Sequence, residues 1–193
     1  MPSLPNARVL IVATDGFEEW ELFGPRQILQ KRGAEVVLAS LKLDEIQGTV
    51  HDKPGKTIKP DVIIDDARAD DFDALILPGG VANPDQLRMH GNVIALIRLF
   101  AEQDKPIGAI CHGPWLLVEA DLVRDRTVTS WPSIRTDLRN AGGNVVNEAA
   151  VTDGNIVTSR NPDDVEAFTN ALIDLIEEMP EVEEIRHPSE LPA

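Results

Sequence analysis

Short apolar runs alternate along this chain with longer stretches whose apolar residues recur at helical spacing. Residues 7–13 are apolar at nearly every position, which is typical of a strand buried on both faces of a sheet. Further strands are expected at residues 35–40, 73–77, 107–110, 127–130, 144–146 and 156–158. The alternation predicts an α/β fold with a mainly parallel sheet.

Helices are expected between these runs, at residues 19–31, 92–103, 114–119, 134–141 and 162–178. Gly33 would end the first helix at the usual C-terminal glycine position. Residues 43–61 contain two glycines and two prolines and predict an irregular hairpin. We expect one domain over residues 7–178, between an N-terminal tail (1–6) and an acidic C-terminal tail (179–193).

Composition narrows the classes of function. The 193 residues, 42% of them apolar, suffice for one substantial core. Acidic side chains outnumber basic ones by 33 to 18, a formal net charge of −15, so we expect no binding to nucleic acid or to anionic membranes. The chain shows neither a secretory leader pattern nor an apolar stretch of about 20 residues, which favours a cytoplasmic protein.

A single cysteine, Cys111, stands where the strand at 107–110 gives way to a helix. One cysteine excludes an internal disulfide and a CxxC motif. The N–H groups at the start of the helix would stabilise a thiolate and make the sulfur nucleophilic. Gly108, Gly113 and Pro114 suit a tight strand-to-helix turn, which favours a reactive cysteine over the alternative of a buried structural one.

Two more segments are expected at the same sheet edge, because parallel sheets bind ligands at the carboxyl ends of their strands. Glu18 and Glu21 follow the first strand and would share a helix face, although acidic residues are also common in any first turn. Gly79 and Gly80 follow the strand at 73–77 and let backbone N–H groups approach a ligand, or simply form a turn.

A carboxylate raises the pKa of a neighbouring thiol, so one of the two groups must keep its proton. We expect a protonated glutamate to donate to Cys111, and the N–H groups of Gly79, Gly80 and His112 to form an oxyanion hole. Consecutive side chains usually diverge, so contact between His112 and the thiol needs a bent backbone. His112 alternatively contacts a carboxylate.

No metal or cofactor is predicted. His51, His90 and His187 lack the spacing of metal ligands and are expected at the surface. The chain has no GxGxxG after the first strand and no GxxxxGK[ST], so nucleotide cofactors are not expected.

Four motifs together resemble the DJ-1/PfpI superfamily, and specifically its PfpI-type intracellular cysteine peptidase branch, over roughly residues 8–177. They are AICHGP around Cys111, LPGG at 77–80, FEEWEL at 17–22 and TSRNPD at 158–163. The resemblance implies a flavodoxin-like three-layer sandwich, a cysteine in a strained elbow, and homodimers or larger assemblies. It also implies a carboxylic acid beside the sulfur, best matched by Glu21, with Glu18 nearby.

In the peptidase branch a neighbouring subunit offers an acidic residue to the site histidine, and the matching position here is Asp85. Aspartate is shorter than the glutamate of that pattern, and the loop is one residue longer. Several relatives carry a histidine where this chain has Trp131, so no second imidazole base is expected.

Two classes of function follow from the residues and the resemblance. The first is a stress-protective cysteine hydrolase (peptidase, deglycase or glyoxalase-like), in which Cys111 attacks a small carbonyl, glycated or peptide substrate and Glu21 or His112 moves protons. The second is a non-catalytic redox sensor in which Cys111 is oxidised to a sulfenic or sulfinic acid. The acidic charge and tail suggest a chaperone as a weaker alternative.

Overall fold

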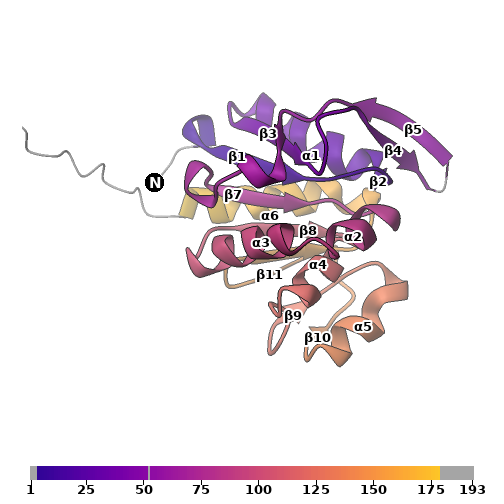
Figure 1. Ribbon diagram of the computed structural model, residues 1–193. Coiled ribbons are helices and arrows are strands. Elements are labelled where there is room, and N and C mark those ends of the chain that lie inside the picture. The colour runs from indigo at the N-terminus through magenta and orange to yellow at the C-terminus, as the bar shows by residue number, and fades with distance from the viewer. Residues whose placement is uncertain (1–3, 52, 179–193) are drawn as a thin grey trace, which may run out of the picture.

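A sheet of seven strands crosses the part of the chain that the structure describes, residues 4–51 and 53–178 of a computed structural model (Figure 1). The strand order is β11-β12-β8-β7-β1-β3-β6, and only β11 runs antiparallel to its neighbour. The strands are β1 (Arg8–Val12), β3 (Glu35–Ser40), β6 (Val62–Ile63), β7 (Ala74–Leu77), β8 (Ile107–Ile110), β11 (Ala150–Asp153) and β12 (Ile156–Ser159). The inner order β3-β1-β7-β8-β12 is that of a flavodoxin-like sheet. The predicted α/β fold is confirmed.

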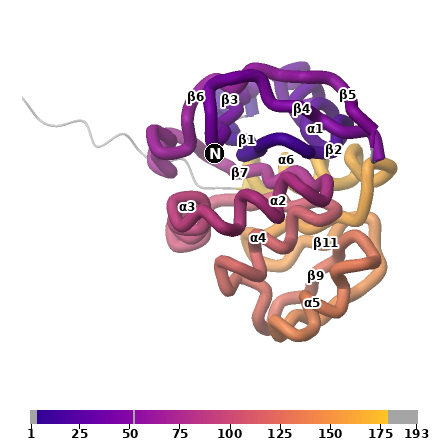
Figure 2. The backbone as a smooth tube through the Cα atoms, turned by 45° about the vertical axis from the view of Figure 1, so that its right-hand side comes forward, coloured from indigo at the N-terminus to yellow at the C-terminus, as the bar shows by residue number. Residues whose placement is uncertain are grey.

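Helices cover both faces of this sheet and make it the middle of three layers (Figures 1 and 2). One face packs against α1 (Glu19–Lys31) and α6 (Val165–Glu178), and the other against α3 (Gly91–Glu102) and α4 (Pro114–Glu119). In β1, Val9 and Ile11 join the first core while Leu10 and Val12 join the second. Burial on both faces explains why the strand sequence is apolar at nearly every position.

The shorter elements lie around this sandwich. The hairpin expected at residues 43–61 is formed by β4 (Ile46–Val50) and β5 (Lys53–Ile58), and β2 (Phe17–Glu18) pairs with β4. The strand expected at 127–130 is β9 (Thr127–Val128), which pairs with β10 (Asn144–Val145) and does not join the large sheet. Two further helices are α2 (Ala82–Leu87) and α5 (Arg135–Asn140).

Some predicted boundaries differ from the structure. The helices expected at 134–141 and 162–178 each begin with a 3-10 turn, Pro132–Ile134 and Pro162–Asp164. Leu4 is buried in the core and lies in the 3-10 turn Leu4–Asn6, so the packed domain reaches into the expected N-terminal tail. The expected C-terminal tail, residues 179–193, lies outside the described residues.

No helix in the described ranges is both long enough and apolar enough to cross a bilayer.

Close packing against β8 generates a prediction for Gly108. A side chain at Gly108 would place its Cβ 2.7 Å from the Phe168 ring of α6. Gly108→Ala is therefore expected to lower the free energy of unfolding by about 1–3 kcal/mol, as overpacked cores do. Urea unfolding measures the change, and adding Phe168→Leu should recover part of it. Strictly additive losses in the double variant would show that the clash is not the cause.

Candidate active site

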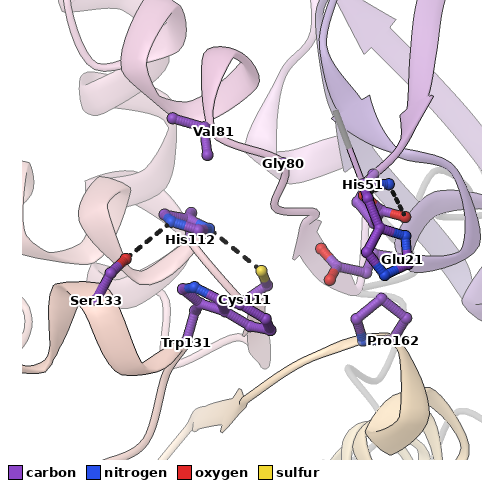
Figure 3. A pocket seen from close by; sticks show the side chains of 10 residues that line it. Glu21, His51, Gly80, Val81, Cys111, His112, Trp131, Ser133 and Pro162 are labelled. Atoms are coloured by element: carbon purple, nitrogen blue, oxygen red, sulfur yellow. Dashed lines mark hydrogen bonds between the residues drawn. The ribbon is translucent and has the colours of Figure 1, made fainter. Parts of the chain in front are cut away.

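Loops after β1, β7 and β8 meet at the carboxyl edge of the sheet and enclose a pocket of about 330 Å³ (Figure 3). The order of the sheet reverses between β1 and β7, which is where open α/β sheets bind their ligands. The pocket is lined by Glu18, Glu21, His51, Gly80, Val81, Cys111, His112, Trp131, Ser133 and Pro162. The structure thus brings together five residues that sequence reasoning selected, Glu18, Glu21, Gly80, Cys111 and His112.

Cys111 occupies a sharp elbow directly after β8. Its φ of 62° lies in the left-handed region that side chains rarely adopt. Two backbone hydrogen bonds hold this conformation, because the Cys111 N–H donates to the Ser159 carbonyl (3.0 Å) and the Cys111 carbonyl accepts from the Trp131 N–H (2.9 Å). The residue is 6% exposed and lines the pocket.

Gly79 gives the cysteine room. A Cβ at this position would lie 2.7 Å from the Cβ of Cys111, so no side chain fits. The Gly79 N–H donates to the Glu21 carboxyl (2.8 Å). That N–H is therefore occupied, and the backbone donors that act on the Cys111 sulfur are those of Gly80 and His112. Of the three N–H groups expected to form an oxyanion hole, that of Gly79 is thus bonded to Glu21, and the oxyanion hole itself stays a prediction.

Glu21 lies on α1 and is fully buried beside Cys111 (Figure 3). Burial raises the pKa of Glu21 to about 8, although hydrogen bonds with Gly79 and with the Cys111 side chain oppose the shift. At neutral pH the carboxyl group therefore holds its proton. A protonated carboxyl can donate to the sulfur, which is the arrangement expected from the sequence.

The pKa of the Cys111 thiol differs from the one expected from the sequence. Burial raises the pKa of Cys111, and an ionised Glu21 raises it further, while the N–H groups of His112 and Gly80 lower it. The first N–H groups of α4, those of Trp115 and Leu116, donate to backbone carbonyls and not to the sulfur, contrary to expectation. The loss of solvent outweighs the two N–H groups that do act on the sulfur. The sulfur is therefore a thiol at neutral pH, and it would react as a thiolate only if a base removed its proton.

The His112 imidazole is within reach of that proton. Its Nδ1 lies 3.3 Å from the Cys111 sulfur, a contact that the positive φ of Cys111 makes possible between neighbouring residues. Burial lowers the pKa of His112, so the imidazole is neutral at pH 7. Trp115 meets the ring edge-on at 5.2 Å between centroids, and Trp131 stacks on it at 6.1 Å.

Ser133 and His51 are pocket residues that sequence reasoning missed. Ser133 Oγ lies 3.2 Å from His112 Nε2. His51 is exposed, as expected, yet it also lines the pocket, and its backbone N–H donates to Glu18 (3.1 Å). Glu18 is the last residue of β2 and precedes α1, so it does not share a helix face with Glu21. His51 directly follows β4, and the parallel pairing of β4 with β2 brings it to the pocket.

Asp85 is not brought to this pocket by its own chain. It is exposed on α2 and does not appear among the described residues that line the pocket. The role of Asp85 across a subunit boundary, and the homodimer that this role needs, stay predictions.

Comparison with known proteins shows the family of the chain. The model of the DJ-1/PfpI family matches residues 7–175, and the chain belongs to that family. It is 38% identical to Deglycase TK1284 of Thermococcus kodakarensis over 169 residues, 88% of this chain and 99% of that protein. It is 40% identical over 172 residues to YraA of Bacillus subtilis, whose name assigns it provisionally to the cysteine proteases, with 89% and 99% of the two chains covered.

Solved structures share the fold. The crystal structure of Drosophila melanogaster DJ-1beta matches with a TM-score of 0.80 and 27% identity, over 88% of this chain and 90% of that one. A two-domain protein from Anabaena variabilis, with DJ-1/ThiJ/PfpI-like and ferritin-like domains, matches with a TM-score of 0.84 and 31% identity. That match covers 94% of this chain and 52% of the two-domain chain.

The buried Glu21 makes stability depend on pH. Its pKa is about 8 in the folded protein against an ordinary value of 4.5, so folding retains a proton that the unfolded chain releases between these values. Stability should fall as pH rises through this interval and level off above it. Glu21→Gln removes this titration. As pH rises through the interval, the free energy of unfolding of the variant should therefore increase relative to that of the wild type, by up to about 1.4 kcal/mol per pH unit.

Urea unfolding of both proteins across this interval measures the effect. Glu166→Gln, at an exposed position on α6, is the matched control and should follow the wild type. A constant difference between Glu21→Gln and the wild type at all pH values would mean that Glu21 is ionised in the folded protein.

Proposed function

We propose that this protein is a cysteine-dependent hydrolase of the deglycase type, which removes small carbonyl compounds from the amines or thiols they have modified and so protects against carbonyl stress. The observation that carries the proposal is the contact of 3.3 Å between the Cys111 sulfur and Nδ1 of His112 in an open pocket. A nucleophile within reach of a neutral base is the signature of covalent catalysis.

The geometry supports a definite first step. Cys111 Sγ attacks the carbon that bears the amine or thiol and a hydroxyl group, and the proton of Cys111 passes to His112 Nδ1. The bond from that carbon to the amine or thiol breaks, and the imidazolium gives its proton to the departing group. A hemithioacetal is left on Cys111, with its oxygen towards the N–H groups of Gly80 and His112, and water then displaces the sulfur, which releases the carbonyl compound as its hydrate and restores the thiol.

The size of the pocket supports a small substrate. A volume of about 330 Å³ lies at the lower end of the range for ligand sites, roughly 300–1,000 Å³. It suits a modified side chain or a small carbonyl compound better than several residues of a peptide. The similarity to Deglycase TK1284 over nearly the whole of that protein supports the same class of substrate.

A redox sensor is less well supported by this site. Oxidation of a cysteine follows its thiolate character and its exposure. Cys111 is 6% exposed, and burial raises the pKa of its thiol. Both properties slow oxidation.

The proposal predicts that Cys111→Ser abolishes turnover while the protein stays folded. Adducts of methylglyoxal with N-acetyl-lysine serve as substrate, and release of the amine is followed with wild type, Cys111→Ser and His112→Gln. We expect a loss of at least about 100-fold for both variants, the usual contribution of a nucleophile or a general base. The rate with Cys111→Ser also measures the spontaneous decay of the adduct.

Two outcomes would contradict the proposal. Equal rates for wild type and Cys111→Ser would remove Cys111 as the nucleophile. Cysteine-dependent cleavage of an unmodified peptide, with no action on the adduct, would make the protein a peptidase.

A further inference from the structure

Both ring nitrogens of His112 have a polar partner (Figure 3). Nδ1 lies 3.3 Å from the Cys111 sulfur, and Nε2 lies 3.2 Å from the hydroxyl oxygen of Ser133. Within residues 4–51 and 53–178 the partner of Nε2 is thus a neutral hydroxyl, and burial is the influence that shifts the pKa of His112. The three side chains form a line that runs from the sulfur to the hydroxyl.

The segment that carries Ser133 is tied to the cysteine elbow. The Trp131 N–H donates to the Cys111 carbonyl (2.9 Å), and the Ile134 N–H donates to the Trp131 carbonyl (3.2 Å) as a 3-10 turn begins. Ser133 lies between these two bonds. The backbone that carries Ser133 is therefore held close to the elbow and to the histidine that follows Cys111.

We infer that Ser133 is a positioning residue that selects the reactive tautomer of His112, an inference that rests on the proposed hydrolase. The Ser133 oxygen accepts a hydrogen bond from Nε2–H, which leaves the lone pair of Nδ1 directed at the thiol. Only this tautomer of a neutral imidazole can take the proton of Cys111. In the opposite tautomer, Nδ1 carries a proton and cannot act as the base.

The hydroxyl also fits the proton balance of the reaction. When the C–S bond forms, the thiol proton moves to Nδ1 and the imidazole becomes an imidazolium with both nitrogens protonated. Nε2–H stays on Ser133 throughout, so the proton on Nδ1 is the one passed to the leaving group. A carboxylate on Nε2 would instead stabilise the imidazolium and raise the pKa of His112.

Alkylation of Cys111 tests the role of Ser133 without any substrate. Rates with iodoacetamide are measured from about pH 5 to about pH 9, on both sides of the ordinary pKa of histidine. Ser133→Ala should lower the rate near neutral pH by about ten-fold, the factor that one hydrogen bond of ordinary strength is worth. Ser133→Thr keeps the hydroxyl and should restore the rate.

The matched control is Thr136→Val, which removes an exposed hydroxyl from α5, three positions further along the chain. It should behave as the wild type. An unchanged profile for Ser133→Ala would overturn the inference. So would a ten-fold loss in Asp85→Asn with none in Ser133→Ala, because the group acting on Nε2 would then come from a neighbouring subunit.

Nitrogen NMR of the His112 ring reads the tautomer directly. Above the pKa of His112, the wild type should carry its proton on Nε2, and Ser133→Ala should show a mixture of the two tautomers. The same tautomer in both proteins would overturn the inference. This readout is independent of turnover: a protein that hydrolyses no adduct, yet changes tautomer with Ser133, would refute the proposed function and leave the positioning role intact.

Discussion

The left-handed backbone at Cys111 is the constraint on which the rest of the site depends. Such a conformation costs of order 1–3 kcal/mol and persists only where its surroundings enforce it. Here the elbow is enforced by the hydrogen bonds to Ser159 and Trp131 on its two sides. It turns the side chain of His112 back beside the sulfur, which an ordinary strand or helix does not allow for consecutive residues. The proposed nucleophile and base therefore come from adjacent positions in the chain.

Burial sets the protonation of all three titratable groups around the sulfur. It raises the pKa of Glu21 and Cys111 and lowers that of His112, because a charged form of either sign loses its solvation. The resting site thus holds an acid, a thiol and an imidazole that are all neutral. In the proposed reaction, charge develops on these groups when the thiol proton moves to His112.

Features with local causes were predictable from the sequence. The bounds of α1, β3, β8 and α4 follow the predicted ranges, because glycine, proline and apolar periodicity mark them within a few residues. The rule for strand ends brought the segment with Glu18 and Glu21 to Cys111, and the family resemblance selected Glu21 as the acid beside the sulfur. His51 and Ser133 escaped prediction, since strand pairing and a backbone bond from Trp131 carry them to the pocket. The raised pKa of the Cys111 thiol was not predicted either, because burial is a property of the packed molecule and not of the local sequence.

The partner of the distal imidazole nitrogen decides what a cysteine and a histidine in this arrangement do. A carboxylate there raises the pKa of the imidazole and favours a resting pair of thiolate and imidazolium, which is reactive towards oxidants as well as carbonyls. A hydroxyl such as that of Ser133 leaves both groups neutral and keeps the sulfur as a thiol until a substrate is bound. In its proposed role, Ser133 would favour hydrolysis over oxidation without any change at the cysteine. Differences in activity on this fold are then to be sought in the segment after β9 as much as in the elbow itself.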